Sequence, residues 1–168
     1  MTTATEPGPT TAPGTGRTGA LPQTIRPLHP SMHLAARAFP VRTPPGDDLW
    51  LHHAVRAASP GEVLVVDCGG ALDFGYWGAD LTIAAIARGL AGLVIHGGVR
   101  DASRLVELGW PIFAATVSTR ATTQDPLGDG ELGDPIVIGA VPVVLGDLVV
   151  GDAAGVVRVP AGRIATLA

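Results

Sequence analysis

The residues whose types and spacing are best suited to chemistry are Arg100 and Asp101, which directly follow Gly97-Gly98-Val99. The apolar run at residues 93–95 predicts a buried strand, and the two glycines predict a turn after it. Charged residues at such a junction lie at the carboxyl edge of a sheet, where open α/β folds bind ligands. The Arg100 guanidinium suits a carboxylate or a polarised carbonyl, and the Asp101 carboxylate suits a helix cap or a hard metal ion. The alternative is an ordinary surface ion pair beside a helix cap.

Two further features of this region could belong to the same site. His96 ends the apolar run, so it could act as a general acid or base beside the charged pair, or be a hydrogen-bonded structural residue. A second helix should begin at Gly78, where the free backbone N–H groups of residues 78–81 suit a carboxylate or oxyanion. Both helices follow parallel strands, so their first turns should open on the same edge of the sheet. The sequence therefore predicts a pocket for a small anionic ligand.

Motifs of several other enzyme classes are missing. The glycines fit neither GxGxxG nor GxxxxGK[ST], which gives no support to nucleotide binding, and no GxSxG nucleophile motif occurs. Cys68 is the single cysteine, so an internal disulfide and a CxxC metal site are excluded, and its place after an apolar strand favours burial. His52 and His53 are adjacent in a helix and point about 100° apart, so they cannot share one metal ion. The aromatic residues at 74, 76 and 77 could wall a pocket or pack at a subunit contact.

Alternating strands and helices must position these groups. Apolar β-branched runs predict strands, and helical spacing between Gly and Pro breaks predicts helices. The strands are expected at residues 34–41, 63–67, 93–96 and 111–114, and the helices at 49–58, 78–88 and 102–108. Asp47 and Asp48 precede the first helix and could cap it, while residues 68–77 are expected to form a glycine-rich loop. Such βαβ crossovers are right-handed and parallel almost without exception.

The two ends of the chain have a different character. Residues 1–20 are Thr, Pro, Gly and Ala with almost nothing to bury, so we expect a disordered tail before a single domain at 21–168. Short strands separated by Gly, Pro and Asp turns are expected at 136–138, 141–145, 148–150 and 156–159. Their spacing indicates antiparallel pairing, as in a small barrel-like layer. The expected fold is one α/β domain with a parallel βαβαβ half and a β-rich C-terminal half.

Composition excludes several classes of partner. Of the 168 residues 46% are hydrophobic, the net charge is −4, and the few basic residues are scattered rather than clustered, so no nucleic acid is expected as a partner. The chain contains no run of about 18 apolar residues, so no transmembrane helix is expected. The N-terminus lacks the basic and apolar segments of a secretory signal. A soluble, cytoplasmic protein with no membrane partner is the resulting expectation.

Several of these segments together resemble the RraA-like family, which includes the class II 4-hydroxy-4-methyl-2-oxoglutarate aldolases. The similarity runs in order from about residue 24 to residue 160. It is carried by GEVLVVD at 61–67, WG at 77–78, ARGLAGLVI at 87–95, GGVRD at 97–101, GWPIFA at 109–114, GDLVVGD at 146–152 and GVV at 155–157. The resemblance implies a swivelling β/β/α-type domain that assembles as a homotrimer, in some members as a hexamer of two trimers, with active sites at subunit interfaces.

The resemblance also implies an activity and site residues. Family aldolases use Mg²⁺ or Mn²⁺ to cleave small 2-oxo acids to pyruvate and a second keto acid, and they decarboxylate oxaloacetate. Arg100 matches the arginine that contacts the keto acid, and Asp101 matches the aspartate that supports the metal. Gly78, Ala79, Asp80 and Leu81 match the backbone turn that receives the pyruvate carboxylate. A divalent ion and Arg100 would stabilise the enolate formed in either reaction.

The chain departs from the family pattern at three places. Ala79 stands where catalytic members carry an acidic residue, His96 replaces an aspartate, and an acidic residue near the C-terminus has no counterpart. The first hypothesis is a metal-dependent carbon–carbon lyase acting on a small 2-oxo acid, with a diverged substrate. A variant gives His96 the acid–base role in a specialised-pathway enzyme. The alternative is a binding or regulatory protein without catalysis, because other relatives bind and inhibit a ribonuclease.

Overall fold

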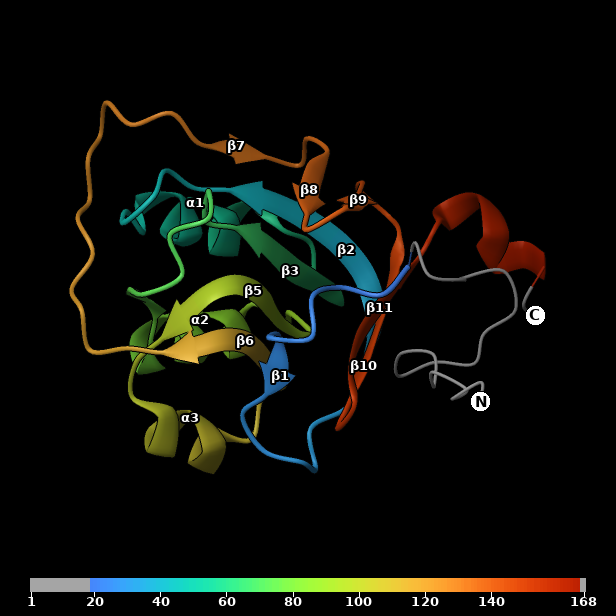
Figure 1. Cartoon of the computed structure of the whole chain (residues 1–168), viewed down its shortest axis with the longest axis horizontal. Coiled ribbons are helices and arrows are strands. Elements are labelled where there is room, and N and C mark those ends of the chain that lie inside the picture. Colours follow the sequence, from blue (N-terminus) through green and yellow to red (C-terminus); the bar gives the residue numbers. More distant parts are fainter. Residues whose placement is uncertain (1–18, 167–168) are drawn as a thin grey trace, which may run out of the picture.

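One mixed β-sheet organises the chain in this computed structural model, which describes residues 19–166 (Figure 1). The helices are α1 (Leu49–Ala57), α2 (Ala79–Ala87) and α3 (Ala102–Leu108), and a 3₁₀ helix η1 spans Ala161–Thr166. The strands of the main sheet are β1 (Arg26–Pro27), β2 (Leu34–Arg42), β3 (Glu62–Asp67), β4 (Gly75–Trp77), β5 (Gly92–Val99), β6 (Ile112–Val117), β7 (Glu131–Leu132), β10 (Leu148–Asp152) and β11 (Gly155–Val159). A separate hairpin pairs β8 (Ile136–Ile138) with β9 (Val141–Val143).

The parallel half of the sheet has the predicted βαβαβ arrangement. The sheet order is β1-β6-β5-β3-β2-β10-β11, and the neighbours β2, β3, β5 and β6 are parallel. Side chains alternate along each strand, so Leu64 and Val66 of β3 pack with the helices, whereas Val63 and Val65 pack on the other face with the β8–β9 hairpin. Burial on both faces explains why these strands are apolar throughout rather than alternating.

The glycines of the central motif lie inside β5, not in a turn after it. The strand expected to end at residue 96 continues to Val99, and part of the loop expected at 68–77 forms β4, which pairs parallel with β5. A Cβ atom on Gly98 would lie 2.2 Å from the Phe74 carbonyl oxygen and 2.6 Å from the Thr116 hydroxyl. The glycines are therefore required by close approach between strands, a tertiary contact that their turn preference does not reveal.

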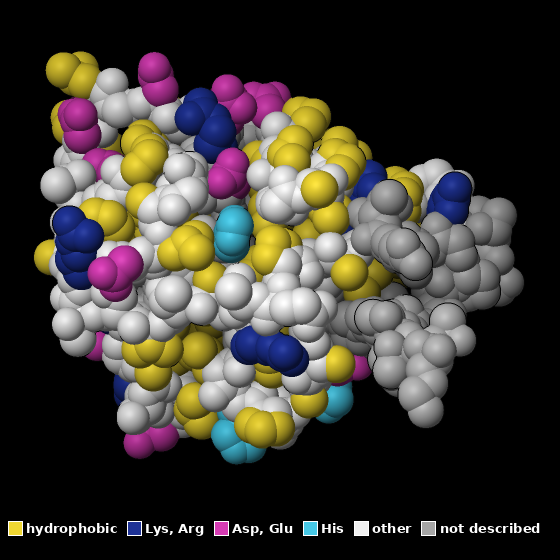
Figure 2. All heavy atoms as spheres, in the orientation of Figure 1, with side chains coloured by type: hydrophobic (Ala, Val, Ile, Leu, Met, Phe, Trp, Pro, Cys, Tyr) yellow, Lys and Arg dark blue, Asp and Glu magenta, His cyan; other side chains and the backbone are white. Residues whose placement is uncertain are grey.

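The C-terminal strands are antiparallel as expected, but they do not form a separate barrel-like layer. β10 pairs with both β2 and β11 and so extends the main sheet, while only β8 and β9 form a second sheet. The tail was expected at residues 1–20; residues 1–18 lie outside the described residues, whereas Ala20 forms a bridge with Val157. Within the described part of the chain, no helix is long and apolar enough to cross a membrane. On the face seen in Figure 2 the basic side chains lie apart from one another.

Candidate active site

Arg100 and the start of α2 are packed directly against each other at the carboxyl edge of the sheet. The Arg100 backbone N–H donates to the Trp77 carbonyl at 2.8 Å, and its guanidinium Nη1 donates to the Gly75 carbonyl. A Cβ atom on Gly78 would lie only 2.8 Å from Arg100 Nε and 2.9 Å from Asp101 Oδ2. Because Gly78 has no side chain, the side chains of Arg100 and Asp101 can pass over the first turn of α2. The prediction that the two helix starts share one edge is confirmed.

Asp101 does not cap its own helix. Its backbone is left-handed, with φ 59°, and its side chain makes no capping hydrogen bond to α3. The carboxylate Oδ2 instead accepts a hydrogen bond of 3.3 Å from the Ala79 N–H, the first of α2. Asp101 therefore occupies one of the N–H groups of the 78–81 turn. The N–H groups of Asp80 and Leu81 have no acceptor among the described residues and remain available for an anion.

Asp48 is a third charged group of the site. Its carboxylate Oδ2 lies 3.8 Å from Arg100 Nη1, and the side chain is only 3% exposed. Oδ1 is buried and accepts no hydrogen bond from any described residue, and His52 Nε2 lies 4.0 Å from it. A buried carboxylate oxygen without a donor is costly, so it indicates a missing partner such as a ligand or water.

The sequence placed Asp47 and Asp48 together as caps of α1, but only the first has that role. Asp47 Oδ1 accepts a 2.9 Å hydrogen bond from the Leu49 N–H, whereas Asp48 occupies the N-cap position without a side-chain capping bond. The repetition itself could have signalled a second role for one of the two, because a helix start needs one capping carboxylate. The second aspartate was therefore free for another role.

A cavity of about 340 Å³ opens beside these groups. Asp48 and Arg100 line one side, and the other side is lined by Thr119, Arg120, Ala121, Thr122 and Gln124. The latter belong to a segment that we call the strap, residues 118–130, which leaves β6 and runs along the left edge of Figure 1 to β7. The volume lies within the range of about 300–1,000 Å³ that is typical of small-molecule sites. No sequence pattern predicted the strap.

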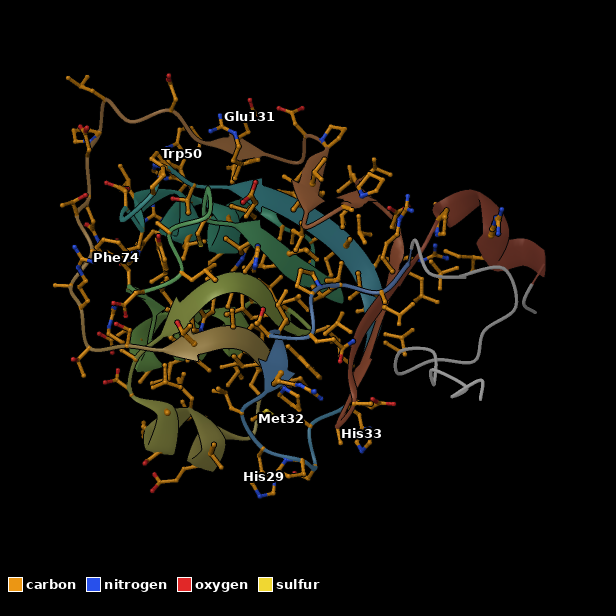
Figure 3. All side chains as sticks on the ribbon, in the orientation of Figure 1. His29, Met32, His33, Trp50, Phe74 and Glu131 are labelled. Carbon is orange, nitrogen blue, oxygen red and sulfur yellow. The ribbon has the colours of Figure 1, made fainter. Side chains whose placement is uncertain are left out.

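The strap is fixed to the start of α1. Asp47 Oδ2 accepts hydrogen bonds from the Thr123 hydroxyl at 2.9 Å and the Asp125 N–H at 2.6 Å. Further along, Trp50 Nε1 donates to the Gly128 carbonyl at 3.1 Å. Figure 3 shows Trp50 and Phe74 at the end of the molecule where the strap passes. One buried carboxylate thus holds both α1 and the wall of the cavity.

Replacing Asp47 with asparagine is expected to destabilise the fold by about 2–4 kcal/mol, because the amide would turn an N–H group toward backbone donors that now share a buried carboxylate. The measurement is the free energy of unfolding in urea, with hydrogen exchange of the strap amides. Asp134→Asn, at an exposed position, is the matched control. Equal stability of the two variants would contradict the assigned anchoring role.

His96 lies away from this cavity. Leu93 and Ile95 of β5 pack with the helices and Val94 packs with the hairpin face, so alternation places His96 on the hairpin face. It pairs in register with Asp67 and is half-buried. Arg100, by contrast, contacts α1 and α2 on the helix face, and no described interaction links it to His96.

The aromatic residues that could have walled a pocket divide between two roles. Trp77 and Tyr76 are buried in the core, where Trp77 stacks on Trp110 with ring centroids 5.8 Å apart. Burial raises the pKa of Tyr76 to about 12, although its oxygen accepts a hydrogen bond from the Gly46 N–H. Cys68 is buried, as its place after an apolar strand predicted, and burial likewise raises the pKa of its thiol. Phe74 does not line the cavity itself but lies beneath the guanidinium of Arg120, whose carbon is 4.3 Å from the ring centroid.

The donor set for a divalent ion is small but suitable for a hydrated one. Among residues 19–166 no group of three His, Cys, Asp or Glu side chains could enclose a metal. Asp101 is exposed beside Arg100 Nε, and Asp48 is buried beside Arg100 Nη1. Mg²⁺ commonly binds proteins through one or two carboxylates while water and substrate complete its shell. Asp101 and Asp48 are therefore the side chains at this edge that could contribute to holding a hydrated divalent ion.

Fold and site together define a class: a swivelling β/β/α-type domain with an arginine-lined cavity at the carboxyl edge of its parallel strands. A family model described as "RraA-like: Aldolase/RraA" matches residues 11–158. The chain belongs to the RraA-like family.

Relatives with assigned names are aldolases. The chain is 36% identical over 143 residues to a Halalkalibacterium halodurans protein provisionally named a 4-hydroxy-4-methyl-2-oxoglutarate aldolase, a match that covers 85% of this chain and 67% of the relative. It is 30% identical over 114 residues to the 4-hydroxy-4-methyl-2-oxoglutarate aldolase of Thermus thermophilus, covering 68% of each. The chain thus spans about two thirds of the length of these relatives, and only 61% of some others.

Two of the solved structures with this fold are described as inhibitors in RNA processing. The RraA structure from Thermus thermophilus aligns with a TM-score of 0.75 at 28% identity and covers 84% of both chains. Streptomyces coelicolor RraAS2, described as an unusual member of the RNase ES inhibitor RraA family, aligns with a TM-score of 0.79 at 29% identity. That match covers 90% of this chain and 77% of the other.

Proposed function

We propose that this protein is a divalent-metal-dependent carbon–carbon lyase that acts on a small 2-oxo acid. The observation that carries the proposal is the placement of Arg100 across Gly78 at the mouth of a cavity, with Asp101 on one side and Asp48 on the other. Oδ1 of Asp48 has no hydrogen-bond partner among the described residues. Family membership and the names of the aldolase relatives support it. These charges suit a reaction in which an enolate forms and must be stabilised.

The chain's own residues account for the steps of an aldol cleavage. The substrate carboxylate would bind the N–H groups of Asp80 and Leu81 at the helix N-terminus. The Asp48 carboxylate would accept the proton of the 4-hydroxyl as the C3–C4 bond breaks and a new carbonyl forms. The bonding electron pair moves into the enolate of pyruvate, whose oxygen Arg100 stabilises, and a proton added at C3 then gives pyruvate.

A bound Mg²⁺ or Mn²⁺ would supply Lewis-acid polarisation of the 2-oxo oxygen. Asp101 would hold the ion, directly or through water. We further propose a homotrimer, or a hexamer of two trimers, in which a neighbouring subunit completes the acidic side of the site in place of the acidic residue missing at Ala79. Light scattering of the purified chain would give the assembly mass.

The test is pyruvate release from oxaloacetate and from 4-hydroxy-4-methyl-2-oxoglutarate, measured with Mg²⁺ and with EDTA. We expect turnover with the metal and none with EDTA, and a loss in Asp48→Asn. His96→Ala should retain turnover because its side chain lies on the other face of the sheet; a loss there with intact folding would instead support the specialised role of His96. Absence of turnover on both substrates from a folded, Mg²⁺-loaded protein would overturn the lyase.

A second candidate is a regulatory binding protein without catalysis. Ala79 in place of an acid and the lack of an enclosing metal cluster in the described residues favour it, as do the two inhibitor structures. It predicts a folded oligomer with no turnover and no stabilisation by Mg²⁺. A metal-dependent rise in melting temperature would speak against it.

A further inference from the structure

Arg120 is a second guanidinium on the cavity that no catalytic step above uses. It lines the cavity together with Arg100, but it comes from the strap rather than from a helix start. Its guanidinium lies over the Phe74 ring, 4.3 Å from the centroid, so its position is partly fixed before any ligand binds. The Phe74 ring in turn packs near Gly46, where a Cβ atom would lie 3.2 Å from it.

The charge of Arg120 is not neutralised by the protein. Asp48 is the one carboxylate among the described residues lining the cavity, and it faces Arg100 at 3.8 Å. Among residues 19–166 no ion pair or hydrogen bond involves the Arg120 guanidinium, whereas the Arg120 backbone N–H donates to the Ser118 hydroxyl at 3.1 Å. Arginine carries five N–H donors in a planar fork that matches a carboxylate. Two guanidiniums facing one cavity with a single carboxylate suit a ligand with two anionic groups.

We propose that Arg120 binds the second carboxylate of a 2-oxo diacid and thereby favours aldol cleavage over decarboxylation. The inference rests on the proposed lyase function and assigns the substrate specificity of that lyase to Arg120. One carboxylate would lie at the start of α2 beside Arg100, and the other would reach across the cavity to Arg120. Thr119 and Thr122, between the two ends, offer hydroxyls to a substrate hydroxyl group.

Whether Arg120 favours aldol cleavage or decarboxylation depends on what happens to the negative charge of the distal carboxylate in each reaction. In aldol cleavage of a 4-hydroxy-2-oxo diacid the C3–C4 bond breaks, and the distal carboxylate stays ionised in the second keto acid, so its pairing with Arg120 persists throughout. In decarboxylation of oxaloacetate the distal carboxylate leaves as neutral CO₂, its bonding pair remains on C3 as the enolate, and one proton then gives pyruvate. An ion pair with that carboxylate stabilises the ground state more than the transition state, so it opposes this reaction.

The binding test compares 2-oxoglutarate with 2-oxopentanoate, which has the same five-carbon chain without the second carboxylate. Calorimetry with Mg²⁺ present should show the wild-type protein binding the diacid about 10- to 100-fold more tightly, the range expected for charged hydrogen bonds. Arg120→Gln should remove that preference while leaving 2-oxopentanoate unchanged. Arg104→Gln, at an exposed residue of α3 paired with Glu107, is the matched control. Equal affinity for both acids in the wild type, or equal weakening of both in Arg120→Gln, would overturn the proposal.

The catalytic test separates this proposal from the lyase itself. Arg120→Gln should lower kcat/KM for 4-hydroxy-4-methyl-2-oxoglutarate about 10- to 100-fold, and should raise KM for oxaloacetate without lowering kcat. A parallel fall of kcat on both substrates would overturn the partition, because it would mean a structural role. Phe74→Leu keeps the guanidinium but removes its support, so it should give a smaller loss in the same direction. If the wild type discriminates the two acids in binding but turns over neither substrate, the lyase fails and the Arg120 assignment stands.

Discussion

Replacing Arg100 with lysine is expected to lower kcat for pyruvate release by about 100- to 1,000-fold, the usual loss when one donor to a developing oxyanion is removed. Lysine keeps the positive charge but not the planar fork, so it cannot bond the Gly75 carbonyl, face Asp48 and reach a substrate oxygen together. The measurement is steady-state kinetics with saturating Mg²⁺, alongside circular dichroism to verify the fold.

Arg104→Lys is the control for this substitution, because Arg104 is an exposed residue on the next helix whose partner is Glu107 at 3.4 Å. Its kcat should stay within about twofold of the wild type, as is usual for surface changes. Turnover in Arg100→Lys within a fewfold of that control would remove Arg100 from the catalytic role.

The second large effect is expected from a single added methyl group, Gly78→Ala. The backbone at Gly78 has φ −141°, which alanine adopts without strain, so the penalty is not conformational. The new Cβ would instead meet Arg100 Nε at 2.8 Å and Asp101 Oδ2 at 2.9 Å, both side-chain atoms that can shift. We therefore expect a modest loss of stability and a loss of about 100-fold or more in kcat/KM, because a displacement of about 1 Å can cost that much.

A matched glycine tests whether this effect is local. Gly162 is exposed and has no heavy atom within 4 Å of the position of a Cβ, so Gly162→Ala should leave stability and turnover unchanged. A crystal structure of Gly78→Ala should show both charged side chains moved from their present positions. Wild-type kinetics in Gly78→Ala would mean that the catalytic groups lie elsewhere.

The sequence predicted the parallel core well because its signals are local. Apolar β-branched runs between Gly and Pro breaks predicted β2, β3, β5 and β6 within a few residues. The meeting of Arg100 with Gly78 followed from topology, since helices after adjacent parallel strands begin at one edge. β4 was missed because three residues in a glycine-rich loop carry no periodicity, and their pairing depends on Gly98 admitting the Phe74 carbonyl.

Of the site itself, only the side formed by Arg100 and the start of α2 could be predicted from the sequence. Asp48 contacts Arg100 across more than fifty residues of sequence, and nothing in the pair of aspartates at 47 and 48 shows which faces the cavity. Arg120 lies in a segment without apolar periodicity, so no pattern placed it near the other arginine. His96 was singled out because it adjoins the motif in sequence, whereas strand alternation turns it to the opposite face.

Because the strap forms one wall of the cavity, the two walls can change independently. One wall carries Arg100, Gly78 and Asp101, which lie at helix starts that continue from buried strands. Most substitutions around them would therefore destabilise the fold. The opposite wall is an exposed connection that is joined to the body by backbone hydrogen bonds of Arg120 and Thr123 as well as by the side chains of Asp47 and Trp50. Related proteins that keep these attachments could exchange the strap residues between them. They would then bind different acids beside the same electrophile, Arg100. In this architecture substrate range can evolve faster than reaction type.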